Sequence, residues 1–194
     1  MVQTIPVALK EWAVAIEALR SGRQILIMRK GGIREETKDF QVESDSFYLF
    51  PTYEHQKKQL LQPEYESDLD KTLENWSAED TEVTIRCYAE LAEDILIEHK
   101  EQLDRLSGLH IWTDTFAEER LKWKRTKPLH LMLLRVYELD EPVSLPIKPD
   151  YIGCKSWIGL ESEALSHTGR KPVLDDEAFR KAVQSVKSAL SQNE

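Results

Sequence analysis

The feature that most constrains the fold is a long apolar run at residues 129–139, L-H-L-M-L-L-R-V-Y-E-L, which contains no glycine or proline. It predicts a long strand, and a strand of this length requires partners in a sheet. Strands are also predicted at residues 24–29, at residues 47–50 and, as a short one, within residues 153–160. Residues 82–97 are ambiguous, but their initial alternation favours a strand.

Helices are predicted between and beyond these strands. Residues 7–21 show near-helical spacing of apolar side chains, and Gly22 stands where a helix-terminating glycine belongs. No strand–helix–strand rhythm repeats, so we expect an α+β fold. It comprises a mixed sheet of about five to six strands, open or barrel-like, with an N-terminal and a C-terminal amphipathic helix packed on it. Residues 1–194 are expected to form one domain, with an acidic surface excursion at 63–80. The other predicted helices are 53–61, 99–106, 113–124 and 175–190.

The charge of the chain disfavours some partners. Its 194 residues carry 26 Lys and Arg against 35 Asp and Glu, a net charge of −9, and residues 61–104 hold 14 of the acids against three bases. This balance disfavours tight nonspecific binding to nucleic acid or to anionic membranes, but it leaves room for a local basic site. No apolar run approaches the roughly 18 residues that cross a bilayer, so no membrane partner is expected. Cys87 and Cys154, far apart in apolar surroundings, predict two buried free thiols and a cytoplasmic location.

The first candidate site is the segment R-K-G-G-I-R-E-E, which follows the apolar strand predicted at 24–29. Glycines let the backbone approach an anion closely, and the flanking guanidinium and ammonium groups supply charged donors. The same letters also fit a hairpin turn with solvated charges, and they form neither a Walker A loop nor a dinucleotide fingerprint. The candidate ligand-binding residues are Arg29, Lys30, Gly31, Gly32, Arg34 and Glu36.

The second candidate site is P-T-Y-E-H-Q, after the strand predicted at 47–50. Thr52 is predicted to cap a helix that starts at Tyr53, which leaves His55 and Gln56 in its first turn. The helix dipole would disfavour charged His55, so the imidazole could serve as a base or a hydrogen-bonding group. A capped helix with an exposed histidine explains the same letters. If the two strands are neighbours, both candidate segments meet at one edge of the sheet.

A run of bases around Trp123 is a third pattern. Basic residues with an aromatic can form a nucleic-acid surface. The spacing of Trp112, Phe116 and Trp123 instead favours a helix that packs these rings in the core and leaves the bases solvated. The bases are Arg120, Lys122, Lys124, Arg125 and Lys127.

A fourth pattern, D-I-L-I-E-H-K, carries Asp94, Glu98 and Lys100. An acid, an apolar stretch and then Glu-x-Lys is the kernel of metal-dependent restriction-type nucleases, although chance produces so short a pattern often. There is no CxxC, H-E-x-x-H or G-x-S-x-G motif, and the five histidines show no metal-ligand spacing. No metal site and no cofactor are therefore predicted.

Several motifs resemble a bacterial family, frequent in cyanobacteria, of domains of unknown function numbered 1802. They are L-K-E-W-A-V-A-I-E-A-L at 9–19, G-R-Q-I-L at 22–26, R-K-G-G-I-R-E-E at 29–36, F-Y-L-F-P-T-Y-E-H-Q at 47–56, L-L-R-V-Y-E-L at 133–139 and C-K-S-W at 154–157. The resemblance covers nearly the whole chain and implies no assigned activity and no catalytic residue. It implies at most a loose link to DNA transactions, through restriction-type domains that accompany the family. E-S-D-S at 43–46 departs from the more basic, histidine-containing approach expected there.

A weaker likeness is to the PUA and ASCH group of small RNA- or nucleotide-binding β-barrels. Gly22 and Arg29 fit the group's pattern, whereas Gln24 and Ile27 stand where it has Lys and Glu. This departure argues against catalysis of that type, so the likeness implies binding alone.

The leading hypothesis is a nonenzymatic or weakly catalytic module that binds a phosphate-bearing ligand, such as a nucleic-acid end or a nucleotide. Residues 29–36 would supply the cationic side of the site, and Thr52, His55 and Gln56 the opposite side. One alternative is a metal-dependent nuclease or phosphodiesterase that uses Asp94, Glu98 and Lys100. The other is a protein-interaction domain whose acidic face, residues 61–104, binds a basic partner.

Overall fold

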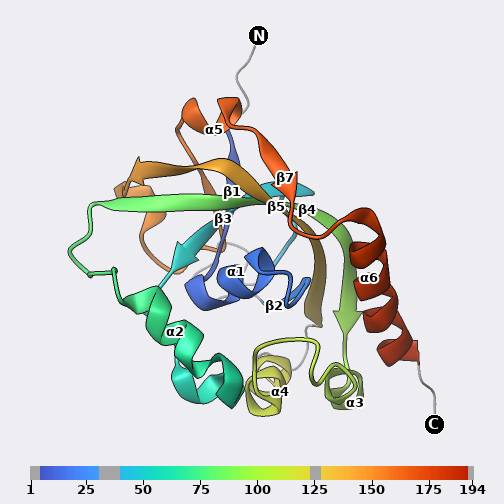
Figure 1. Cartoon of the computed structure of the whole chain (residues 1–194). Helices are drawn as coiled ribbons and strands as arrows, with labels where there is room; N and C mark the ends of the chain where they lie inside the picture. Colours follow the sequence, from blue (N-terminus) through green and yellow to red (C-terminus); the bar gives the residue numbers. More distant parts are fainter. Residues whose placement is uncertain (1–4, 31–39, 123–127, 192–194) are drawn as a thin grey trace.

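The computed structural model describes residues 5–30, 40–122 and 128–191, which form a mixed seven-stranded sheet with helices around it. The sheet curls into a half-barrel (Figure 1). Its strand order is β2-β5-β4-β3-β1-β6, and β7 pairs with β5. The predicted α+β class and mixed sheet are confirmed, with more strands than expected. The strands are β1 (Val7–Trp12), β2 (Leu26–Arg29), β3 (Ser46–Thr52), β4 (Glu82–Ile97), β5 (Leu129–Pro146), β6 (Trp157–Gly159) and β7 (Arg170–Pro172).

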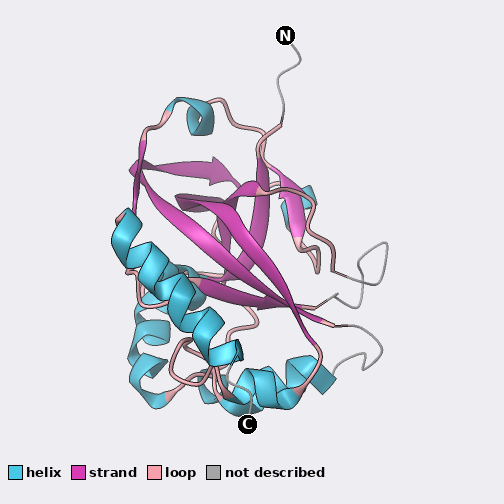
Figure 2. Cartoon of the chain, turned by 90° about the vertical axis from the view of Figure 1, so that its right-hand side faces the viewer, coloured by secondary structure: helices cyan, strands magenta, loops and turns pink. Residues whose placement is uncertain are grey.

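The antiparallel pair of β4 and β5 forms the long axis of the sheet. Irregularities in their register, between Ile85 and Cys87 and between Leu91 and Glu93, interrupt the ladder. Such bulges bend a strand and increase its twist, which fits the curl seen in Figure 2. The predicted strand at 129–139 is confirmed but continues through Pro142. This proline lies where the register between the two strands is broken, so its missing N–H removes no regular ladder bond.

The N-terminal segment corrects one prediction, because residues 7–21 are not a single helix. They divide into strand β1 and helix α1 (Ala13–Arg20). β1 runs parallel to β3 and antiparallel to β6, and its adjacent residues Ala8 and Leu9 are both buried, in different apolar clusters. A strand buried on both faces shows no polar alternation, so its local pattern resembles that of the helix that follows. α1 ends at Arg20, and Gly22 follows its C-cap Ser21 as the terminating glycine that was predicted, with a φ of 71°.

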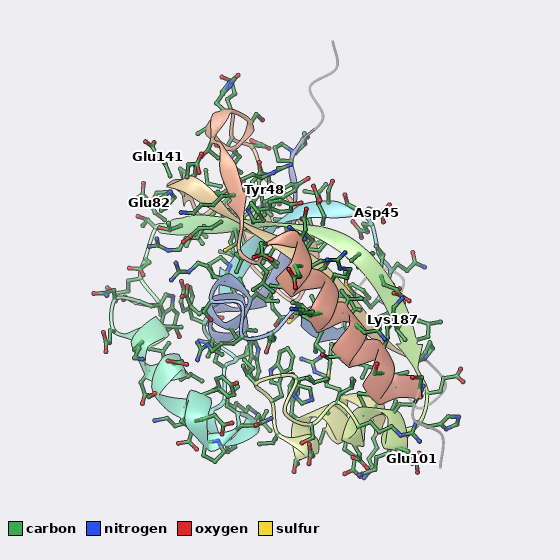
Figure 3. All side chains as sticks on the ribbon, turned by 45° about the vertical axis from the view of Figure 1, so that its right-hand side comes forward. Asp45, Tyr48, Glu82, Glu101, Glu141 and Lys187 are labelled. Atoms are coloured by element: carbon green, nitrogen blue, oxygen red, sulfur yellow. The ribbon has the colours of Figure 1, made fainter. Side chains whose placement is uncertain are left out.

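Helix α1 lies within the curve of the sheet, and α2, α4 and α3 lie at one end of it (Figure 1). The C-terminal helix α6 lies along β4, where the Nζ of Lys187 is 2.6 Å from a carboxylate oxygen of Glu93 (Figures 2 and 3). This amphipathic helix is confirmed. The remaining elements are η1 (Lys58–Leu60), η2 (Pro63–Tyr65), α2 (Glu66–Leu73), α3 (Lys100–Asp104), α4 (Asp114–Lys122), η3 (Pro149–Tyr151), α5 (Ala164–His167) and α6 (Asp176–Ser191).

The two cysteines are both free, but only one is buried. Cys87 lies in the core, where burial raises the pKa of its thiol to about 12. Cys154 is exposed, contrary to prediction, because it belongs to the loop that connects η3 to β6 rather than to a strand. Within the described residues, no helix is long and apolar enough to span a membrane.

The turn after α1 provides a test of this fold. Replacing Gly22 by Ala should lower the free energy of unfolding by at least about 1–2 kcal/mol, because a left-handed backbone disfavours a Cβ. A Cβ there would also lie 2.8 Å from Leu174 Cδ2. Gly108→Ala is the matched control, since its φ is 83° and its Cβ would meet nothing within 4 Å. Urea denaturation should show the larger loss for Gly22→Ala, and an equal or smaller loss would contradict the packing described.

Candidate functional site

A cleft of about 1240 Å³ opens beside the ends of β1 and β3 and is also lined by residues of α1, α4 and the loop before β6. Four predicted site residues line it: Arg29, Lys30, Thr52 and His55. The two candidate segments therefore share one cleft as far as the structure describes them. Gly31, Gly32, Arg34 and Glu36 lie outside the described residues.

Arg29 is the most firmly held cation in this cleft. Its Nη1 donates to the backbone oxygen of Lys10 (3.1 Å) and to the Glu11 carboxylate (3.3 Å), and its Nη2 donates to Ser156 Oγ (2.6 Å). The guanidinium also lies over the ring of Phe40, at 5.4 Å from its centroid. Only 15% of the side chain is exposed. Arg29 is thus fixed in one orientation by partners from three segments of the chain.

These contacts cross the opening of the curled sheet. Arg29 is the last residue of β2, which forms one edge of the sheet. Glu11 belongs to β1, and Ser156 directly precedes β6 at the opposite edge. The guanidinium therefore joins two parts of the sheet that share no backbone ladder. Glu11 is itself only 7% exposed and also accepts a hydrogen bond from the Trp12 backbone N–H (2.8 Å).

Sequence reasoning missed Arg120, which it assigned to a solvated face. The side chain is half-buried in the cleft, with its guanidinium 5.1 Å from the centroid of the Phe116 ring. Burial lowers the pKa of Arg120; the charge of Arg29 acts in the same direction, and that of Glu11 opposes it. In the described parts of the chain Arg120 forms no ion pair. The helical i, i+4 spacing from Phe116 is the signal that could have placed it on the inner face.

Among the described residues, the part of the cleft around Arg29 therefore holds two guanidinium groups, those of Arg29 and Arg120, and the buried carboxylate of Glu11. Arg29 uses Glu11, which leaves the charge of Arg120 without a described counterion. A local excess of positive charge in a partly desolvated site attracts an anion. Guanidinium groups are also suited to phosphate and carboxylate, because their N–H groups form a planar fork.

Lys30 plays a different part from the one predicted. Its side chain is buried, and its Nζ donates to the backbone oxygen of Leu121 at the end of α4 (2.5 Å). Burial lowers the pKa of this ammonium group. Lys30 thereby holds the end of α4, and with it the neighbouring Arg120, beside β2.

The helix predicted at 53–61 is not formed. β3 continues through Thr52, and residues 53–57 form a turn before η1. Thr52 consequently caps no helix; its hydroxyl donates to the backbone oxygen of Glu11 (3.0 Å). His55 is exposed at the cleft and is not at a helix N-terminus, so the dipole argument for a neutral imidazole does not apply. Pairing of β3 with β1, which local sequence does not reveal, extends the strand to this point.

Gln56 is turned toward α1, and it does not line the cleft. Its Oε1 accepts from the Val14 backbone N–H (2.8 Å), and its Nε2 donates to Thr72 Oγ1 (3.3 Å). The N-cap residue of α1 is Trp12, which offers no side-chain acceptor. Gln56 therefore supplies from a distance the capping hydrogen bond that the local sequence lacks.

The geometry gives the nuclease alternative no support. Asp94 is hydrogen-bonded to His130 Nδ1 (2.8 Å), and Lys100 Nζ donates to both carboxylate oxygens of Asp104 (2.7 Å each). Glu98 is exposed. Across the described ranges, no three His, Cys, Asp or Glu side chains are grouped to hold a metal ion.

The acids of residues 61–104 are partly neutralised within the chain. Asp68 pairs with Arg23 and Lys71. Other acids of this region pair with bases on η1, β7 and α6, so the face presents less free negative charge than its sequence suggests. In the basic run, Lys122 is exposed and pairs with Glu118, and residues 123–127 lie outside the described ranges.

Comparison with known proteins identifies a family. The profile of the family described as Domain of unknown function (DUF1802) matches residues 8–185. The chain belongs to the DUF1802 family. The matched region of this DUF1802 chain includes every described residue that lines the cleft. The comparison with curated proteins found no match.

Solved structures of an ASCH protein are similar to this chain. The crystal structure of ASCH from Zymomonas mobilis is 13% identical, with a TM-score of 0.47, over 84% of this chain and 96% of that one. A mutant of the same Zymomonas mobilis protein is 10% identical, with a TM-score of 0.45, over the same shares of the two chains.

The role of Gln56 can be tested by stability. Gln56→Ala should lower the free energy of unfolding by about 0.5–2 kcal/mol, the range for losing a helix cap, because the Val14 N–H loses its acceptor. Gln59→Ala is the control, since Gln59 is exposed on the adjacent 3₁₀ turn. Equal stability of the two variants in chemical denaturation would show that the Gln56 amide is not a cap.

Proposed function

We propose that this protein binds a phosphate-bearing ligand, such as a nucleotide or a nucleic-acid end, at Arg29 and Arg120. The observation that carries the proposal is that the cleft holds the guanidinium groups of Arg29 and Arg120, and that the Glu11 carboxylate forms an ion pair with Arg29 alone among the described residues. A phosphate group would supply the missing negative charge, and its oxygens would accept hydrogen bonds from the N–H groups of both arginines.

The charge of the whole cleft supports this choice of ligand. Among its described lining residues, nine Lys or Arg stand against seven Asp or Glu, whereas the full chain has 26 against 35. The cleft is thus locally cationic on an acidic protein. This contrast favours an anion at one place and disfavours nonspecific binding of polyanions elsewhere on the surface.

The rigidity of Arg29 supports binding for a second reason. Its hydrogen bonds to Lys10, Glu11 and Ser156 set the guanidinium orientation before any ligand arrives. Ordering a free arginine on binding costs side-chain entropy, and a pre-oriented one avoids much of that cost. Its Nε takes part in none of these bonds and stays available to a ligand.

We further propose that the module binds without catalysing a reaction. A general base needs a proton within reach and a partner that orients it. His55, the histidine that lines the cleft, is exposed and has no hydrogen-bond partner among the described residues. The cleft offers charge recognition, and no acid–base pair is assembled around that histidine.

The proposal is tested by titrating the protein with adenosine monophosphate (AMP) in a calorimeter. Arg120→Gln should weaken binding by about tenfold to a hundredfold, because a hydrogen bond to a charged group contributes roughly 1.5–3 kcal/mol. Binding should also weaken as salt is added. Arg180→Gln, at an exposed position of α6 outside the cleft, is the matched control and should bind normally.

Arg120→Gln is preferred to a change at Arg29, because removing Arg29 would leave buried Glu11 unpaired and reduce stability. Thermal unfolding should show that the Arg120→Gln and Arg180→Gln variants both remain folded. Equal affinity of Arg120→Gln and the unmodified protein, or no binding of AMP at millimolar concentration, would overturn the proposal.

A further inference from the structure

The cleft also contains a pair of stacked aromatic rings that the anion centre does not use. The rings of Tyr53 and Trp76 lie 5.3 Å apart between centroids, with an interplanar angle of 14°. Both residues line the cleft and are half-buried. Tyr53 follows the last residue of β3, and Trp76 lies in the turn after α2, where its backbone N–H donates to Leu73 O (3.3 Å).

This pair has the properties of a stacking platform. Tyr53 is stacked on one face of the Trp76 indole, and Trp76 is only half-buried where it lines the cleft, so a planar ligand group would stack on the opposite face. Two rings already held parallel lose little freedom when a third ring stacks on them. A rigid aromatic surface of this kind favours flat, π-bearing groups over sugars or aliphatic chains.

The platform and the anion centre belong to one continuous site. Thr52 hydrogen-bonds the backbone of Glu11, the carboxylate residue of the anion centre, and Tyr53 is the next residue along the chain. The cleft, at about 1240 Å³, is also larger than the roughly 300–1,000 Å³ typical of small-ligand pockets. It therefore has room for a ligand with two distinct parts.

Charges near the platform argue against a second phosphate there. The charged groups that act on Tyr53 are Arg86, Glu17 and Asp80, one base and two acids, in contrast to the excess of guanidinium at the anion centre. A neutral, hydrogen-bonding ring suits such mixed surroundings better than a second anion. Arg86, Glu17 and Asp80 all line the cleft.

We infer that the ligand is a nucleotide, with its phosphate at Arg29 and Arg120 and its base stacked on Trp76. This inference rests on the proposed function and adds the identity of the group that carries the phosphate. The same chemistry is offered by a free mononucleotide and by the terminal nucleotide of a polynucleotide chain.

The experiment compares AMP with ribose 5-phosphate, which has the same phosphate and sugar but no base. AMP should bind about five- to a hundredfold more tightly, the range for stacking one base on an aromatic side chain. Trp76→Ala should remove this difference by weakening AMP binding and leaving ribose 5-phosphate binding unchanged. Trp76→Phe, which keeps a ring, should retain most of it. Calorimetry measures the Kd of the tighter complexes, and NMR titration measures any Kd in the millimolar range, as expected for the weaker ligand.

The outcomes separate the two claims. Equal affinity of the intact protein for AMP and ribose 5-phosphate, or AMP binding that Trp76→Ala does not change, overturns the stacking inference and leaves the phosphate site standing. Failure of both probes to bind, or binding that is indifferent to Arg120→Gln, overturns the proposed function itself.

A 5′-phosphorylated oligonucleotide serves as a third probe. If the oligonucleotide binds more tightly than AMP with the same dependence on Trp76, the natural ligand is the end of a polynucleotide. If the two affinities are comparable, the natural ligand is a free nucleotide. Both results support the inference.

Discussion

The contact of Arg29 with Glu11 and Ser156 is the interaction on which the rest of the site depends. The sheet curls so far that the end of one edge strand, β2, approaches β1 and the start of β6, to which the Arg29 side chain is hydrogen-bonded. Backbone pairing does not join these parts, and one guanidinium does so instead. Because Glu11 is buried, losing Arg29 would leave an uncompensated charge, which typically costs about 3–5 kcal/mol. The same side chain thus stabilises the curled sheet and presents part of its charge to the cleft.

Arg120 turns this structural ion pair into a candidate binding site. An Arg29–Glu11 pair alone is neutral and needs no ligand. A second guanidinium on α4, kept near by the Lys30 contact with Leu121, adds a positive charge that no described residue pairs, in partly desolvated surroundings. Stability and recognition are therefore linked, since the carboxylate that fixes Arg29 also limits the excess to about one charge. One phosphate group is enough to balance it.

The sequence was informative where local pattern decides structure. The apolar runs at 24–29 and 129–139 and the amphipathic C-terminal segment predicted β2, β5 and α6, and Gly22 marked the end of α1. It failed where distant pairing decides. β1 pairs with strands about 40 and 150 residues away and is buried on both faces, so its pattern resembled that of a helix. Thr52 and Gln56 were predicted to lie at the start of a helix. Thr52 instead hydrogen-bonds β1, and Gln56 caps α1, which has no side-chain cap of its own. Nothing in the sequence around Glu11 and Ser156 marks them as partners of Arg29, because they contact it only when the two parts of the curled sheet come together.

The most direct test of the central claim is an NMR titration with AMP that follows arginine Nε–Hε signals, assigned by single Arg→Lys substitutions. The account predicts that the signals of Arg29 and Arg120 shift together and saturate with one Kd. The signal of Arg180, exposed on α6 outside the cleft, should not move. Shifts spread over surface arginines, with Arg29 and Arg120 unchanged at saturation, would contradict the claim that these two guanidinium groups form an anion site.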